Sequence, residues 1–225
     1  MTGDAADKIG KQNGGWTITW QGTENTNSNF PGATSIYGGI ASAMNDIGGS
    51  TELSADGKWA KKPDVAVVVF GEDPYAEGVG DIDSLAYKFG SNKDLRLLEK
   101  LRDQGIPVVS IFLTGRPLAV NAELNASDAF VVAWLPGTEG QGISDVIVAD
   151  KQGQPRFDFT GRLPFDWPNL ELNADDKHLP VADNILKAGD GLSFGDAEII
   201  AEQLDKGVVA SGVSARLVVF NRTSR

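Results

Sequence analysis

The chain has 225 residues, of which 41% are hydrophobic and 23% charged, and this composition is sufficient for a globular fold with one large core. Its formal net charge of −11 disfavours nucleic acid and anionic lipid as partners, because an acidic surface repels both. The sequence holds no cysteine and a single histidine, His178, which excludes disulfides, thiolate catalysis and two-histidine metal sites. No apolar run approaches the roughly 18–20 residues of a membrane helix, and the first residues show no leader pattern.

Apolar runs and helical patterns alternate along the first two thirds of the chain. Three runs are apolar almost throughout, as strands buried on both faces of a parallel sheet are. These runs are residues 64–70, 107–113 and 129–135. Apolar side chains recur at helical spacing in residues 34–47, 92–104 and 139–149. The alternation predicts an α/β fold, doubly wound around a mostly parallel sheet.

The two ends of the chain and its later third fit this alternation less well. Only two residues precede the first Gly-Asp turn, so we expect the first strand to be truncated. Residues 157–186 are rich in proline and lack periodicity, and we expect them to pack over the sheet as loops. Residues 216–220 predict a last strand or a link to a further segment. We therefore expect one domain at residues 1–196 and a C-terminal extension at residues 197–225.

Candidate functional residues follow the predicted strands. In an open α/β sheet, ligands bind beyond the carboxyl ends of the strands. The residues at these positions are polar and acidic, and the N-terminal segment GGWTITWQG adds two tryptophans. Carboxylates beside aromatic rings are typical of sugar sites, where the rings stack on the apolar face of a pyranose. The candidate residues are Trp16, Trp20, Glu72, Asp73, Tyr75, Glu77, Arg116, Thr138 and Glu139.

Most of these residues also have a purely structural interpretation. The two tryptophans lie four residues apart, so a strand or a helical turn puts both rings on one side, where ordinary packing accounts for them. Glu72 is suited to capping the segment that follows it, and Glu139 opens a helix, where the dipole favours negative charge. Arg116 is suited to pairing with a nearby carboxylate, and Glu77 to a solvated surface position.

Two short motif matches do not predict chemistry. GLSFG at residues 191–195 fits the nucleophile elbow of α/β-hydrolases, but no histidine follows Ser193. GTEGQG at residues 137–142 is rich in glycine, yet it lacks the lysine of a phosphate loop and presents an acidic side chain to any anion. These failures disfavour a flavodoxin-like nucleotide or flavin binder. We expect no cofactor and no metal.

Five segments, read in order, resemble the second domain of family 3 glycoside hydrolases, and the resemblance extends to about residue 192. The segments are GGWTITWQG at residues 14–22, FGEDPYAE at 70–77 followed by Gly80-Asp81, TGRP at 114–117, AWLPGTEGQG at 133–142, and FTGRLP at 159–164 with Trp167. Each segment alone is a weak signal, whereas five in the same order are specific. The sequence departs from the family at GDGL, residues 189–192, where Gly-Tyr-Gly-Leu is usual.

The resemblance implies a six-stranded α/β sandwich that follows a TIM-like barrel. It implies a retaining β-glucosidase or exo-β-glucanase, acting on a β-glucoside or β-glucan, whose nucleophile Asp lies on the barrel and whose acid/base Glu lies on this domain. Glu77 matches the acid/base position. Glu72 is the alternative, although its place beside the strand suits a residue that organises the loop.

The resemblance also assigns roles to the aromatic and supporting residues. Trp20 matches a tryptophan that clamps the sugar, and Trp16 is expected to pack beneath it. The supporting residues are Glu72, Asp73, Tyr75, Arg116 and Glu139. We expect the isolated chain to be inactive and the enzyme to be secreted or periplasmic. A non-catalytic carbohydrate-binding or interaction module with the same fold is the alternative.

Overall fold

The computed structural model describes the chain except for residues 89–90, 173–177, 181–183, 197–215 and 220–225. Its helices are α1 (Ile9–Asn13), α2 (Ile36–Asp46), α3 (Lys93–Asp103), α4 (Asn121–Asn125) and α5 (Gln141–Ile147), with short 3₁₀ turns at Asn27–Asn29 and Phe194–Asp196. Its strands are β1 (Ala66–Gly71), β2 (Val108–Leu113), β3 (Ala129–Trp134), β4 (Leu170–Leu172), β5 (His178–Pro180) and β6 (Arg216–Val219). No helix in these ranges is long and apolar enough to cross a membrane.

The centre of the fold is a parallel sheet in the order β1-β2-β3-β6. A single parallel bridge at Thr2 extends it beyond β1: the amide of Thr2 donates to the carbonyl of Val67 at 3.0 Å, and the amide of Val69 donates to the carbonyl of Thr2 at 2.9 Å. The predicted α/β class and parallel sheet are confirmed. Within the described residues, the sheet has four strands and this bridge, where six strands were expected.

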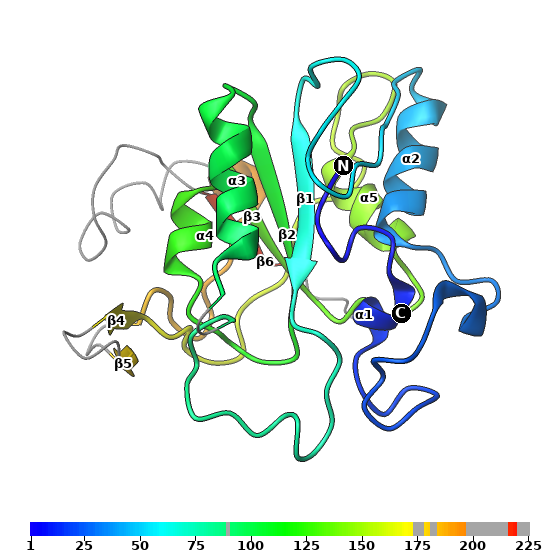
Figure 1. Cartoon of the computed structure of the whole chain (residues 1–225). Helices are drawn as coiled ribbons and strands as arrows, with labels where there is room; N and C mark the ends of the chain where they lie inside the picture. Colours follow the sequence, from blue (N-terminus) through cyan, green and yellow to red (C-terminus); the bar gives the residue numbers. More distant parts are fainter. Residues whose placement is uncertain (89–90, 173–177, 181–183, 197–215, 220–225) are drawn as a thin grey trace.

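Helices cover both faces of the sheet, with α3 and α4 on one side and α2 and α5 on the other (Figure 1). This layering follows from the apolar strands, because alternate side chains of a strand point to opposite faces. The face towards α3 and α4 buries Phe70, Phe112 and Phe130, whose ring centroids lie 5.6–6.2 Å apart. The opposite face buries Val69, Ile111 and Val131 against α2 and α5.

The three predicted helices, α2, α3 and α5, begin and end within a few residues of the predicted bounds, whereas α1 and α4 were not predicted. Ser35 caps α2, because its hydroxyl accepts a hydrogen bond from the amide of Gly38 at 3.0 Å. Asn92 occupies the capping position of α3, but its side chain makes no capping hydrogen bond. Gly105 lies directly beyond α3 with φ +64°, a backbone conformation that favours glycine.

The later third packs over the sheet, as predicted. Trp167 is buried, and its indole nitrogen donates to the carbonyl of Leu118 at 2.8 Å. An antiparallel hairpin of β4 and β5, which the sequence did not predict, follows this tryptophan. The predicted strand at residues 216–220 is confirmed as β6, which pairs with β3. Residues 197–215 lie outside the described residues, so the domain boundary at residue 197 stays a prediction.

Candidate active site

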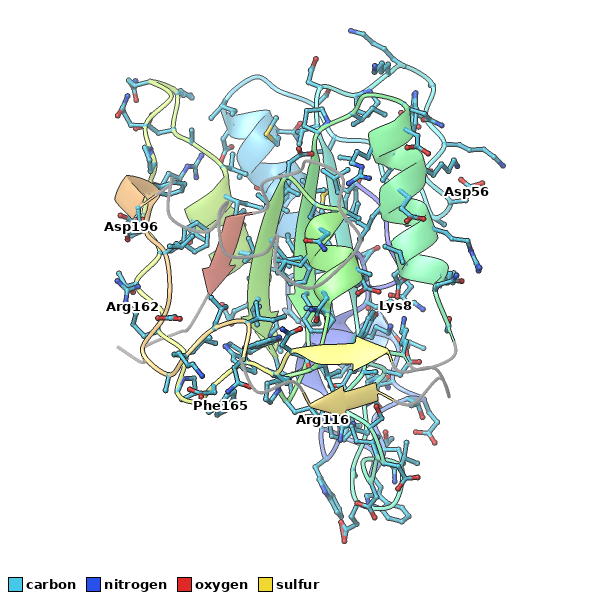
Figure 2. The ribbon with its side chains drawn as sticks, turned by 90° about the vertical axis from the view of Figure 1, so that its left-hand side faces the viewer. Lys8, Asp56, Arg116, Arg162, Phe165 and Asp196 are labelled. Atoms are coloured by element: carbon cyan, nitrogen blue, oxygen red, sulfur yellow. The ribbon has the colours of Figure 1, made fainter. Side chains whose placement is uncertain are left out.

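The candidate residues gather at one edge of the sheet. The loops after β1, β2 and β3 leave the sheet at the edge to which these strands point, and the segment after α1 descends to the same side (Figure 1). Figure 2 shows Arg116 and Phe165 at this edge, whereas Asp56 lies near the opposite one. The placement agrees with the general rule that strand ends build the sites of open α/β sheets.

Glu72 and Arg116 form an ion pair between the loops that follow β1 and β2. The Nε and Nη2 atoms of Arg116 each lie 2.9 Å from Oε1 of Glu72, and the hydroxyl of Thr114 donates to Oε2 at 2.6 Å. The side chain of Glu72 is only 14% exposed and that of Arg116 only 20%. Arg116 also donates from Nη1 to the carbonyl of Gly80, which lies farther along the loop. The carboxylate of Glu72 is therefore bound within the domain.

Tyr75 lies under this ion pair. The guanidinium carbon of Arg116 is 4.1 Å from the centre of the tyrosine ring, at cation–π distance. Burial raises the pKa of Tyr75 above its usual value, the charge of Glu72 adds to this effect, and Arg116 opposes it. Gly115 passes against the ring, since a Cβ there would lie 2.7 Å from the tyrosine hydroxyl. The TGRP turn therefore needs its glycine for close packing.

Glu77 differs from Glu72 in its exposure and in its pairing. Its side chain is exposed, five residues farther along the same loop. Its carboxylate makes no hydrogen bond or ion pair with any residue that the structure describes. The two glutamates that the sequence offered for one role thus have opposite environments. Glu72 is paired with other groups of the domain, whereas Glu77 is exposed to solvent.

Trp16 and Trp20 lie close together, with ring centroids 6.2 Å apart and planes inclined by 46°. Their segment is neither strand nor helix: φ is +57° at Trp16 and +64° at Ile18, and the amide of Trp16 donates to the carbonyl of Trp20 at 2.8 Å. Trp16 is 68% exposed and Trp20 55%, so the expectation that Trp16 packs beneath Trp20 was wrong. Ile18, which lies between them in the sequence, is 63% exposed, and exposed apolar side chains gathered in this way are typical of binding sites and interfaces.

A buried lysine that the sequence did not single out fixes Asp73. The ammonium of Lys11, whose side chain is 5% exposed, lies 2.9 Å from Oδ1 of Asp73 and 2.8 Å from Oδ2 of Asp4. Lys88 links Asp4, at 3.5 Å, to Asp94, at 2.7 Å. Burial alone would raise the pKa of Asp4, but the two lysines outweigh it and hold this pKa below its usual value. The network anchors the start of the loop after β1.

Glu139 lies on the exposed turn before α5, and its carboxylate accepts a hydrogen bond from the hydroxyl of Thr138 at 3.2 Å. The backbone of this turn is fixed by Gln12, a fully buried residue that the sequence did not single out. Its amide donates to the carbonyls of Thr34 at 3.2 Å and Gly137 at 2.9 Å, and it accepts from the amide of Ile36 at 3.0 Å. Gln12 thus joins α1, α2 and the turn after β3.

Metal coordination finds no support at this edge. In the described part of the chain, no group of three or more His, Cys, Asp or Glu side chains lies close enough to hold a metal ion. What the edge offers is a free carboxylate, an exposed aromatic pair and an arginine that is already paired. These groups suit proton transfer and sugar stacking.

Comparisons with known proteins agree with the resemblance found in the motifs. Residues 1–205 match the model of the glycosyl hydrolase family 3 C-terminal domain. The chain is 34% identical over 218 residues to the lysosomal beta glucosidase of Dictyostelium discoideum, which covers 86% of this chain and 25% of that protein. It is 31% identical over 117 residues to the periplasmic beta-glucosidase of Salmonella typhimurium, which covers 48% of this chain and 13% of that protein.

A solved structure resembles the whole described fold. The exo-1,3/1,4-beta-glucanase (ExoP) of a Pseudoalteromonas species superposes with a TM-score of 0.83 at 48% identity, over 93% of this chain and 26% of that one. This chain thus spans about a quarter of the length of such relatives. Because the family model matches nearly all of the sequence, the chain belongs to glycoside hydrolase family 3, as its C-terminal domain.

Proposed function

We propose that this chain supplies the general acid/base to a retaining β-glucosidase or exo-β-glucanase, with Glu77 as the proton donor. The observation that carries the proposal is the contrast between the two glutamates of one loop. Glu72 is paired with Arg116 inside the domain, whereas Glu77 is exposed and its carboxylate is unpaired among the described residues. A general acid has to come within hydrogen-bond reach of the leaving oxygen, so it has to project from its own domain to serve a sugar held elsewhere.

The mechanism divides the two carboxyl groups between two domains. Retaining hydrolysis needs these groups about 5–5.5 Å apart across the glycosidic bond. The Asp of a TIM-like barrel, outside this chain, attacks the anomeric carbon while Glu77 gives its proton to the departing oxygen. Glu77 then takes a proton from the water that displaces the enzyme's carboxylate from the sugar. Docking of the two domains is therefore part of catalysis, and the isolated chain is inactive.

The exposed tryptophans support a sugar substrate. Trp16 and Trp20 present their rings to solvent on the same side of the sheet as Glu77, and aromatic faces stack on the apolar faces of pyranose rings. Gln21, next to Trp20, contacts the backbone of Glu77, so the platform lies beside the acid. We assign Trp20, with Trp16, to the clamp on a β-glucoside or β-glucan beyond the scissile bond. Asp73, Tyr75, Arg116 and Glu139 support the loops around it.

The test combines this chain with the barrel domain. The chain is expressed together with its barrel, and wild type, Glu77→Gln and Glu72→Gln are compared on glucosides with good and poor leaving groups. Glu77→Gln is expected to lower kcat/KM, which reports the first chemical step, by about 10²–10⁴ on poor leaving groups and by much less on activated aryl glucosides, which need little protonation. Glu99→Gln, an exposed substitution on α3, is the matched control. Equal losses on both substrate classes would count against the acid role.

The same experiment separates the alternative, a non-catalytic carbohydrate-binding or interaction module. The exposed tryptophan pair suits that function as well. A binding module predicts that the sugar binds the chain alone and that no variant at Glu77 changes turnover after the barrel is added. The enzyme predicts activity only with the barrel, and only with an acid at position 77.

The names of two relatives bear on location. One is a lysosomal and the other a periplasmic β-glucosidase, and both compartments lie outside the cytosol. We therefore propose that the enzyme containing this chain is secreted or periplasmic. Fractionation of the native cells should recover its activity outside the cytosolic fraction, and a purely cytosolic activity would contradict this location.

A further inference from the structure

Gln21 joins the tryptophan segment to the loop that carries Glu77. Its side-chain oxygen accepts a hydrogen bond from the amide of Ala76 at 2.7 Å, and its side-chain nitrogen donates to the carbonyl of Glu77 at 3.1 Å. A glutamine amide has one acceptor and two donors in one plane, so it pairs with the backbone as a neighbouring strand would. The two partners lie more than fifty residues away along the sequence.

These two bonds bracket the backbone that aims the Glu77 side chain. The amide of Ala76 is the first backbone group of the dipeptide Ala76-Glu77, and the carbonyl of Glu77 is the last. Gln21 therefore holds both ends of this dipeptide. The carbonyl of Ala76, in the middle, accepts from the amide of Gly80 at 2.7 Å. Three hydrogen bonds thus restrict the dihedral angles that set the direction of the Cα–Cβ bond of Glu77.

The two segments also approach closely on either side of Gln21. A Cβ at Gly15 would lie 1.9 Å from the carbonyl oxygen of Tyr75, and a Cβ at Gly22 would lie 2.9 Å from the Cβ of Pro74. Only glycine permits so close an approach at both places. The tryptophan segment and the first half of the acid loop therefore form one packed unit, and both descend from the same end of the sheet (Figure 1).

We propose that Gln21 is a positioning residue that sets the place of Glu77 relative to Trp20 within this domain, before any other domain docks. This inference rests on the proposed function, since it assumes that Glu77 is the acid. Gln21 touches neither proton nor sugar in this role: it acts through the backbone of the acid loop. Because Trp20 is its neighbour in sequence, one side chain couples the sugar platform to the proton donor.

The test uses the enzyme in which the chain is joined with its barrel. Gln21→Met keeps the length of the side chain and removes both hydrogen bonds, and Gln152→Met, at an exposed turn, is the matched control. We expect Gln21→Met to lower kcat/KM by about 10–100-fold on glucosides with poor leaving groups, because a displacement of about 1 Å costs up to that much. The loss on activated aryl glucosides should be several-fold smaller.

The ratio of the kcat/KM values for the two classes of glucoside separates positioning from a general loss of structure. A merely unstable variant has less active enzyme, which lowers both apparent kcat/KM values equally and leaves their ratio unchanged. Hydrogen exchange gives a second measurement, in which the amides of Ala76 and Gly80 should exchange faster in Gln21→Met than in the control. If Gln21→Met does not fold, Gln21→Glu, which keeps the acceptor for Ala76, carries the same comparison.

The outcomes distinguish this proposal from the proposed function. A loss in Glu77→Gln together with an unchanged ratio in Gln21→Met overturns the positioning role and leaves the acid assignment intact. No loss in Glu77→Gln overturns the proposed function and the positioning role with it. A changed ratio and faster exchange in Gln21→Met, with Gln152→Met like wild type, support the positioning role.

Discussion

Glu123 on α4 carries a buried carboxyl group whose pKa the fold raises. Glu123 is 8% exposed, and the pKa of its carboxyl group is raised to about 7 from an ordinary 4.5. Burial is the main cause and the charge of Asp94 adds to it, whereas a backbone hydrogen bond and Lys88 oppose it. The folded state therefore binds this proton more tightly than the unfolded state does. Glu123→Gln keeps the shape of the side chain and removes the titration.

The size of the effect follows from the two pKa values. The difference of about 2.5 between 7 and 4.5, at 1.36 kcal/mol for each pH unit, is about 3 kcal/mol. The sign follows from proton binding: between pH 4.5 and 7 the unfolded chain has lost a proton that the folded chain retains. The free energy of unfolding should thus fall by about 3 kcal/mol as the pH rises through this window, and stay level above it.

The assay is urea unfolding of wild type and Glu123→Gln at pH 5, 6, 7 and 8. The quantity of interest is the difference between Glu123→Gln and wild type in the free energy of unfolding. In this difference, the contributions of the titrating groups that both proteins share cancel. This difference should grow in favour of the variant up to about pH 7. Glu24→Gln, at an exposed turn, is the control and should follow the wild type at every pH. Parallel profiles for wild type and Glu123→Gln would refute a buried, neutral Glu123.

Two further predictions concern the residues that hold the site together. Gln12→Leu removes three hydrogen bonds to backbone groups around a fully buried side chain, so the free energy of unfolding should fall by about 3 kcal/mol or more in urea titrations. A fall below about 1 kcal/mol would show that water replaces the amide. Arg116→Lys offers one point charge where Glu72, Gly80 and the Tyr75 ring need a planar fork. It should cost about 1–3 kcal/mol and speed hydrogen exchange in residues 75–80, and unchanged exchange would contradict that role.

The sheet and its helices were predictable because each element carries a local pattern. Strands buried on both faces are apolar at nearly every position: Ala66–Gly71 shows this, and Val108–Leu113 departs from it only at the buried Ser110. The short helices α1 and α4 span five residues each, which is too few for a period to register. The rule that loops at strand ends meet placed Glu72 and Arg116 in the same region, although it did not specify their hydrogen bonds.

The tryptophan segment was not predictable, since spacing arguments assume a regular backbone. The positive φ angles at Trp16 and Ile18 redirect the chain twice within a few residues, so both rings reach solvent instead of stacking one beneath the other. Non-glycine residues rarely adopt this conformation, and no local sequence signal marks it here. The roles of Lys11 and Gln21 were not predictable for a related reason, because their partners Asp73 and Ala76 lie far away along the sequence.

The division between satisfied and unsatisfied groups explains how half of an active site can form on one domain. Glu72, Asp73 and the backbone around Glu77 have their charges and hydrogen bonds met inside the domain. Among the candidate site residues, the carboxylate of Glu77 and much of the apolar surface of Trp16 and Trp20 lack a partner within the described part of the chain. Changes to the first group should therefore alter the stability and exchange of the isolated chain. Changes to Glu77 or Trp20 should leave the stability and the exchange unaltered and appear only in turnover, since the partners that we propose for them are the sugar and the barrel.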